Sequence, residues 1–250
     1  MIIYLVRHGE TEWNAKGRFQ GREDIALNEN GRKQAMLLAG KFAGKNVRSI
    51  ISSPLKRAAQ TADIINTAFP HAERRSDERL TERDLGGLSG LTKPERIELR
   101  EQGPIMDMEP LGNVMRRMYE ALCDADTGSA GIRTDGRRRQ YEAVDSLCPA
   151  EDESTADITG IVTDTMKYGG KWYMDPSGID FRATDLTADE KEGECIILVS
   201  HGAAINALLS MLSGGKIGSG KTILRNIAIS IVREEPEGFM VMDYDITDKI

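Results

Sequence analysis

Two of the three histidines in this chain each follow a short apolar run and precede a glycine. His8 comes after residues 2–6 and stands beside Arg7, while His201 comes after residues 195–199. A neutral imidazole can attack phosphorus and form a phosphohistidine, and a neighbouring arginine offers a planar fork of donors that matches phosphate oxygens. The two motifs therefore predict phosphoryl-transfer chemistry, provided that both imidazoles face one pocket.

Bounded apolar runs of this length are typical of buried strands in an α/β sheet. In open α/β sheets, ligands bind just beyond the carboxyl ends of the strands. Arg-His-Gly at 7–9 and Ser-His-Gly at 200–202 stand at such ends. Each motif alone is more often an ordinary surface turn, but two motifs in the same relation to a strand favour a shared site.

Arg57 falls in the first turn of a helix that we expect after Ser53-Pro54, with serine as the cap and proline at the first helical position. Free N–H groups at a helix start and a guanidinium group both favour an anion. His201 also precedes a helical stretch, at 203–212. Two arginines, two histidines and helix N-termini would form a cationic cage, which stabilises charge on a transferring phosphoryl group.

Strand and helix patterns alternate along the first 70 residues. Asn28 is suited to cap a helix that Gly44 can end, and residues 48–52 then read as a second strand. Near the other end, residues 223–232 and 239–246 are expected to be two strands around a turn at 234–238. This order predicts a three-layer α/β/α sandwich with a mostly parallel central sheet.

The middle of the chain, from about 103 to 193, is irregular. Helices are expected at 114–122 and 154–168, and a hairpin containing Trp172 and Tyr173 within 169–189. We interpret the segment as an α/β insertion or lid over one edge of a single domain spanning residues 1–250. A functionally neutral insertion fits the pattern equally well.

Composition limits the function classes. The 250 residues are 40% hydrophobic and 29% charged, as in a globular domain. The net charge of −7 argues against nonspecific nucleic-acid binding, but a local arginine cluster can still favour an anionic substrate. We expect no membrane span and no secretory signal. The odd number and wide spacing of Cys123, Cys148 and Cys195 predict reduced thiols and a cytoplasmic location, with Cys195 as a buried structural thiol.

Residues 5–14, which read LVRHGETEWN, resemble the signature of the histidine phosphatase superfamily, phosphoglycerate mutase-like branch. Further segments continue the resemblance in the family's order. They are Arg18-Phe19-Gln20-Gly21 with Leu27-Asn28, then residues 52–62, 80–90 and 199–202. Together the segments cover roughly residues 1–95 and 195–232, whereas the middle of the chain is poorly covered.

The resemblance implies roles for particular residues. His8 would be the nucleophile that becomes phosphorylated, and Glu82 the general acid and base that protonates the leaving oxygen and later activates water. The residues implied in the phosphate pocket or beside the nucleophile are Arg7, Asn14, Gln20, Gly21, Arg57 and His201. The assignment of Glu82 depends mainly on this match, because a carboxylate in the charged stretch 73–84 is usually solvated. We expect no cofactor and no metal, since the histidines and cysteines show no ligand spacing.

Members of this family transfer phosphate to a sugar acid, as mutases, or to water, as phosphatases. Glu82-Arg83 and residues 91–95 resemble the mutase segment that carries a substrate-binding lysine. However, Ala203 stands where mutases carry asparagine, and Arg116-Arg117 lies in a predicted helix instead of a proline-rich loop. Losing those donors should weaken the grip on a second anionic group.

We therefore predict a phosphatase that hydrolyses a small phosphorylated metabolite through a phosphohistidine on His8. A bisphosphoglycerate-dependent phosphoglycerate mutase and a catalytically silent binding or regulatory member are the alternatives. The expected partner is a small-molecule phosphate ester, with neither nucleic acid nor membrane, and a homodimer is among the oligomeric states left open. Glu153-Ser154 faintly resembles the family's Glu-Ser segment, which would place the additional material at 104–150. His71, after Pro70, is expected at the surface.

Overall fold

The structure, a computed structural model, describes residues 1–103, 107–125, 193–236 and 238–246. A six-stranded sheet has the strand order β3-β2-β4-β1-β5-β6. The first four strands in that order are parallel, and the last two run antiparallel to their neighbours. The strands are β1 (Ile2–Arg7), β2 (Asn46–Ser52), β3 (Glu73–Ser76), β4 (Glu194–Ser200), β5 (Ile229–Glu235) and β6 (Gly238–Ile246).

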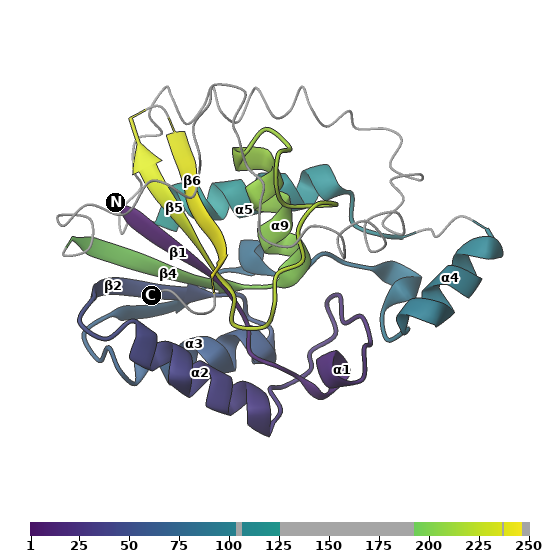
Figure 1. Ribbon diagram of the computed structural model, residues 1–250, viewed down its shortest axis with the longest axis horizontal. Helices are drawn as coiled ribbons and strands as arrows, with labels where there is room; N and C mark the ends of the chain where they lie inside the picture. The colour runs from purple at the N-terminus through teal and green to yellow at the C-terminus, as the bar shows by residue number, and fades with distance from the viewer. Residues whose placement is uncertain (104–106, 126–192, 237, 247–250) are drawn as a thin grey trace.

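Helices cover both faces of the sheet (Figure 1). α2 (Glu29–Lys41) and α3 (Lys56–Asn66) lie on one face, and α5 (Leu111–Ala125) and α9 (Gly202–Leu212) on the other. The shorter elements are α1 (Glu12–Ala15), α4 (Lys93–Glu101) and the 3-10 turns η1 (Glu78–Leu80) and η2 (Gly86–Leu88). The expected three-layer α/β/α sandwich with a mostly parallel sheet is therefore confirmed.

Strand β1 lies in the middle of the sheet, and its residues from Ile2 to Val6 are apolar because both faces of the strand are covered. Its residues alternate between two cores, as the twofold period of a strand requires. Ile3 and Leu5 pack with α5 and α9, whereas Ile2, Tyr4 and Val6 pack with α2 and α3. Strand β1 is thereby fixed from two sides, and the residues that follow it leave the sheet at a defined point.

β1 and β4 are parallel neighbours, and their register pairs Arg7 with Ser200. The backbone N–H of His8 donates to the carbonyl of Ser200 at 3.0 Å, which continues the ladder one residue beyond β1. His8 and His201 consequently leave the sheet side by side. This register brings together the two motifs that lie far apart in the sequence.

The N-terminal caps of α2 and α3 can be compared with those predicted from the sequence. Asn28 caps α2 as expected, since its side chain accepts from the N–H of Gly31 at 2.7 Å. The expected serine cap of α3 is wrong. The helix begins at Lys56, and Ser53 instead forms a local turn by accepting from the N–H of Leu55 at 3.2 Å. The N–H of Lys56 donates to the carboxylate of Asp24 at 2.7 Å. Asp24 is a capping group from a distant segment, which no local sequence pattern indicates.

Two further expectations need correction. β5 begins at Ile229, so residues 223–228 are not strand; they form a loop over the end of β1, where the carbonyl of Ala228 accepts from Arg7 N at 3.0 Å.

α5 falls within the predicted insertion at 103–193, yet its Val114, Met118 and Leu122 side chains are fully buried in the core. Its apolar residues recur at helical spacing, which is the pattern of a core helix. Residues 126–192, with the other elements predicted there, lie outside the described residues.

Single residues outside the site also follow expectation. His71 is exposed. Cys123 and Cys195 are both buried. Cys195 is a free thiol, and burial raises its pKa to about 11, as suits a structural role. None of the helices described here combines the length and the apolar character needed to cross a bilayer.

The turn after His8 packs tightly against the start of α2. A Cβ atom on Gly31 would lie 2.1 Å from the carbonyl oxygen of Glu10, and one on Gly9 would lie 2.5 Å from the carbonyl oxygen of Gly31. Asn28 adds a bond from its side-chain amide to the Glu10 carboxylate at 2.8 Å. Helix α2 therefore holds the backbone that carries His8.

We predict that Gly31→Ala lowers the free energy of unfolding by about 1–3 kcal/mol, because backbone atoms must move to admit the methyl group. Gly40→Ala is the matched control on the same helix, where nothing lies within 4 Å of an added Cβ. The control should gain up to about 1 kcal/mol from helix propensity. Urea unfolding measures both changes, and equal stability of the two variants would contradict the close packing at Gly31.

Candidate active site

His8 and His201 lie against each other at the carboxyl ends of β1 and β4. Their ring centroids are 5.2 Å apart at an interplanar angle of 57°, and both residues are buried. Arg7, Arg57 and Glu82 surround them, and we refer to these five residues as the candidate site. The structure thus brings together the residues that the sequence placed in a cationic cage.

The hydrogen bond of His8 defines its tautomer. Nδ1 lies 2.6 Å from the carbonyl oxygen of Gly9, and because a carbonyl oxygen accepts, Nδ1 carries the proton. Burial lowers the pKa of His8 well below 6.5, and the charges of Arg57 and Arg7 lower it further, against an opposing effect of the bond to Gly9. Near neutral pH the ring is therefore uncharged, and its Nε2 carries a lone pair, as a nucleophile requires.

His201 has the opposite tautomer. Its Nδ1 accepts from Nε of Arg57 at 3.1 Å, so the proton of the neutral ring is on Nε2. Burial, followed by the charge of Arg57, holds the pKa of His201 well below 6.5. Nε2 of His201 and Nε of Arg7 are buried and have no hydrogen-bond partner among the described residues. Two buried donors that lack acceptors in one site are suited to an oxyanion.

Arg57 is fully buried at the second position of α3. Besides His201, it donates to the carbonyls of Glu23 at 2.5 Å and Gly21 at 2.8 Å. Burial lowers the pKa of Arg57 to about 10, so the guanidinium remains a cation near neutral pH. Arg57 therefore connects the loop at 21–23 to His201 while it supplies positive charge.

Glu82 follows η1 and is half-buried. Its Oε1 accepts from the N–H groups of Ala204 and Arg83, both at 2.9 Å, and its Oε2 from the N–H of Ala203 at 3.2 Å. The carboxylate thus lies at the N-terminus of α9, next to the capping residue His201. Its charge also raises the pKa of Arg7 and Arg57 against the effect of their burial. This geometry places Glu82 in the site independently of the family resemblance.

The other residues predicted from the sequence lie next to the candidate site and contact its supporting loop. Asn14 Oδ1 closes a capping box with Thr11 at the start of α1 and accepts from Asn226 Nδ2 at 3.3 Å. Gln20 Oε1 accepts from the Thr11 hydroxyl at 3.0 Å. Gly21 has φ +50°, and an added Cβ would lie 2.8 Å from the hydroxyl oxygen of Ser89. These residues build the loop next to His8, and no bond between them and the imidazole of His8 occurs within the described part of the chain.

Two residues that the sequence did not indicate hold the backbone next to the His8 imidazole. Asn226 Nδ2 donates to the carbonyl of His8 at 3.1 Å, and the Thr61 hydroxyl accepts from the N–H of Gly9 at 3.1 Å. Thr61 lies one helical turn after Arg57 on α3, a spacing that places both on one face. Asn226 carries no comparable sequence signal.

Residues 215–222 read GKIGSGKT and match the pattern of a phosphate-binding loop. That pattern functions between a strand and a helix, whereas here it follows α9 and leads to β5. Thr222 donates to the side-chain oxygen of Asn206 at 2.7 Å, and Lys221 Nζ to the carbonyl of Gly215. The match therefore does not mark a nucleotide site. In the described ranges, no three His, Cys, Asp or Glu side chains are grouped to hold a metal ion.

Known proteins with similar sequences and structures show the family of this chain. The profile of the histidine phosphatase superfamily (branch 1) matches residues 3–131. PhoE of Bacillus subtilis, named as an uncharacterized phosphatase, is 27% identical over 248 residues, which cover 99% of this chain and 96% of PhoE. The probable phosphoglycerate mutase GpmB of Yersinia pestis is 40% identical over 236 residues, which cover 92% of this chain and 83% of GpmB.

A solved mycobacterial glucosyl-3-phosphoglycerate phosphatase, in complex with VO3, has the same fold. Its TM-score is 0.64 at 20% sequence identity, and the match covers 98% of this chain and 99% of that one. The chain belongs to the histidine phosphatase superfamily, branch 1. Its relatives carry the names of phosphatases and phosphoglycerate mutase-like proteins, which supports an enzyme of the phosphatase or mutase type.

The neutral imidazoles predict a pH dependence of stability. Folding lowers the pKa of His8 and His201, so between the folded pKa and about 6.5 the unfolded chain binds more protons than the folded protein. Stability is therefore fully present above about pH 6.5 and falls below it, by up to about 1.4 kcal/mol per pH unit for each histidine.

Urea unfolding at pH 7.5 and 5.5 measures this loss. We expect His201→Asn to lose less stability than the native protein between these two pH values, whereas His71→Ala, at the exposed histidine, should behave as the native protein does. An equal loss in the native protein and in His201→Asn would show that the His201 ring is not held neutral.

Proposed function

We propose that this protein is a phosphatase that hydrolyses a small phosphorylated metabolite through a phosphohistidine on His8. The observation that carries the proposal is the bond from Nδ1 of His8 to the carbonyl of Gly9, at 2.6 Å. This bond leaves the Nε2 lone pair unprotonated beside two cationic arginines and two buried donors without acceptors among the described residues. A nucleophile and an electrostatic clamp for phosphate thus occupy one site.

The reaction proceeds in two steps. In the first step, Nε2 of His8 attacks phosphorus, a P–N bond forms, and the P–O bond to the leaving group breaks as Glu82 donates a proton to the departing oxygen. In the second step, a water molecule attacks phosphorus, Glu82 takes a proton from it, and the P–N bond breaks to release inorganic phosphate. Arg7, Arg57 and His201 stabilise the charge on the transferring group in both steps.

A phosphoglycerate mutase is the second candidate, because relatives such as GpmB bear that name. Two structural observations favour hydrolysis. Ala203, which offers no side-chain amide, donates its backbone N–H to Glu82, and all five donors of Arg117 are used within the protein. Neither residue can grip a second anionic group of the substrate. A panel of sugar phosphates, phosphoglycerates and nucleotides, assayed alongside bisphosphoglycerate-dependent mutase activity, separates the two candidates and identifies the substrate class.

We predict that His8→Ala abolishes turnover of every phosphate ester that the native protein hydrolyses, because the described residues place no second nucleophile beside His8. Rapid quenching of the native protein with a 32P-labelled substrate should trap an acid-labile, alkali-stable phosphoenzyme, which His8→Ala lacks. His71→Ala, at the exposed histidine, is the control and should retain both properties. A fully active His8→Ala would exclude the proposed mechanism.

We expect Glu82→Gln to slow esters with poor leaving groups more than it slows 4-nitrophenyl phosphate, whose leaving group departs without a proton. The loss in kcat/KM should be about 10²–10³-fold for an alkyl phosphate and less than about 10-fold for the nitrophenyl ester. Steady-state kinetics on both esters measures the ratio. Equal slowing of the two would refute the acid role of Glu82.

A further inference from the structure

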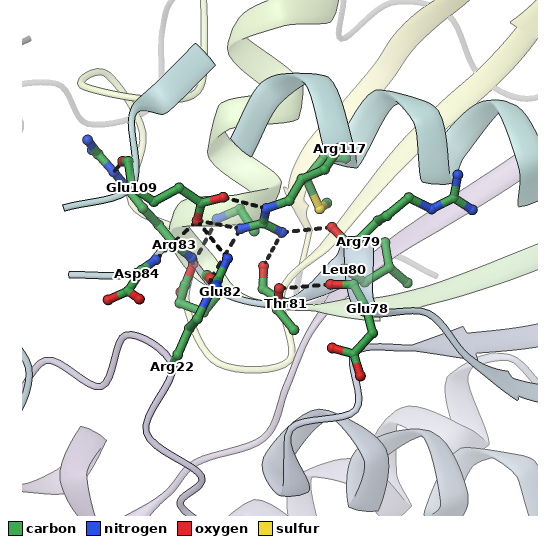
Figure 2. Close-up of polar contacts among 12 residues, drawn as sticks. Arg22, Glu78, Arg79, Leu80, Thr81, Glu82, Arg83, Asp84, Glu109 and Arg117 are labelled. Atoms are coloured by element: carbon green, nitrogen blue, oxygen red, sulfur yellow. Dashed lines mark hydrogen bonds and ion pairs between the residues drawn. The ribbon is translucent and has the colours of Figure 1, made fainter. Parts of the chain in front are cut away.

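Arg117 reaches from α5 to the short segment that carries Glu82 (Figure 2). Its Nη1 donates to the carbonyls of Arg79 at 2.7 Å and Thr81 at 2.6 Å, and its Nη2 donates to the carbonyl of Glu82 itself at 3.1 Å. One guanidinium group therefore binds three carbonyls within four residues. Since this segment is not part of the sheet, these bonds satisfy carbonyl groups that no strand partner pairs.

Glu109 completes the arrangement from the other side. Its Oε1 accepts from Nε of Arg117 at 2.8 Å and its Oε2 from Nη2 at 3.0 Å, a two-point ion pair in which the side chains are 15% and 11% exposed. Glu109 Oε2 also accepts from the N–H of Asp84 at 3.1 Å, and its carbonyl accepts from Nε of Arg83 at 2.7 Å. The pair thus holds the chain on both sides of Glu82.

The donors of Arg117 are fully used. Nε, both N–H groups of Nη1 and both of Nη2 each have a partner, which accounts for the five donors of a guanidinium group. Arg117 therefore has no donor left for a substrate oxygen. Arg22 also approaches Glu109, at 3.3 Å, but its side chain is 47% exposed, so water screens that contact.

The segment needs such an anchor because of what Glu82 must reach. Its carboxylate has to stay at the N-terminus of α9, where the proton transfer would occur. Helices α5 and α9 pack in one hydrophobic core, and His201 caps α9. An arginine on α5 that binds the Glu82 backbone therefore fixes Glu82 relative to His201. A misplacement of about 1 Å in a catalytic group can cost on the order of 10²-fold in rate.

We propose that Arg117, oriented by Glu109, is the positioning residue that keeps Glu82 in place as the general acid. This inference rests on the proposed function, because it presupposes the acid role of Glu82. Arg117 acts through the Glu82 backbone and touches neither substrate nor nucleophile. Its loss should therefore impair proton donation specifically, while phosphate binding and the attack by His8 persist.

The experiment compares the variants Arg117→Met and Arg79→Met. It also includes Glu82→Gln alone and the double variant of Arg117→Met with Glu82→Gln. Arg79 is a matched control, because it also joins this segment to α5, through Asp124 at 2.6 Å, but its side chain does not bond to Thr81 or Glu82. kcat and KM are measured for an alkyl phosphate and for 4-nitrophenyl phosphate, together with the Tm of each variant.

We expect Arg117→Met to lower kcat for the alkyl phosphate by about 10–100-fold and for the nitrophenyl ester by less than about 3-fold, with little change in KM. In the Glu82→Gln background the same substitution should add no further loss, because the step that it impairs is already gone. Arg117→Lys should recover part of the activity. Arg79→Met should lower the Tm and leave the ratio of the two esters as in the native protein.

The following outcomes would overturn the inference. If Arg117→Met slows both esters equally, or if its effect multiplies with that of Glu82→Gln, Arg117 has a general structural role while the proposed function stands. If Glu82→Gln itself leaves the ester ratio unchanged, the acid assignment fails and the positioning role fails with it. If Arg117→Met does not fold, Glu109→Gln replaces it in the same comparison, where a smaller shift of the ester ratio in the same direction is expected and equal slowing refutes the proposal.

Discussion

The parallel pairing of β1 with β4 is the constraint on which the rest of this structure depends. The register that sets Arg7 opposite Ser200 releases His8 and His201 from adjacent strands at the same edge. A shift of one residue would turn the side chains of a strand to the other face and exchange its two core contacts. Since Ile3 and Leu5 pack on one face and Tyr4 and Val6 on the other, the two cores hold that register and thereby the distance between the imidazoles.

The resulting site is costly for the folded protein in the absence of an anion. Two guanidinium groups lie beside two buried imidazoles, and their charges help to keep both rings neutral. Nε of Arg7 and Nε2 of His201 lack acceptors within the described structure. Sites that violate the usual rules of packing and charge are expected where a protein functions, because a bound ligand supplies what is missing. The same repulsion that disfavours a protonated His8 makes its lone pair available.

Several of these features could be predicted from the sequence because their causes are local. The apolar runs before His8 and His201 define strands, and the Asn28 cap depends on residues three positions apart. The sequence also predicts that Arg57 lies near a helix start, which is confirmed, although the capping group of α3 is Asp24, from a remote loop. In the sequence, the role of Glu82 follows only from the family resemblance. Its bond to the N-terminus of α9 joins residues that lie far apart in the sequence, so nothing in the charged stretch around Glu82 distinguishes it from its neighbours.

The ion pair between Arg117 and Glu109 could not be predicted from the sequence. In the sequence, Arg116-Arg117 was informative only as a pair displaced from the loop where mutases carry it. The contacts of Arg117 depend on where α5 packs. The irregular sequence of 103–193 predicts that α5 belongs to an insertion, whereas the helix lies in the core. Long-range contacts of this kind follow from the assembled layers, whereas caps and strand ends follow from a few neighbouring residues.

A crystal structure of the protein with orthovanadate would test whether the two imidazoles and Arg7 bind one phosphoryl group, because vanadate mimics phosphorus under attack. We predict that vanadium bonds to Nε2 of His8 and that vanadate oxygens accept from Nε of Arg7 and Nε2 of His201, while Nδ1 of His8 still donates to the carbonyl of Gly9. Vanadate bound away from the two imidazoles, or a His8 ring turned so that Nδ1 faces the anion, would contradict this prediction.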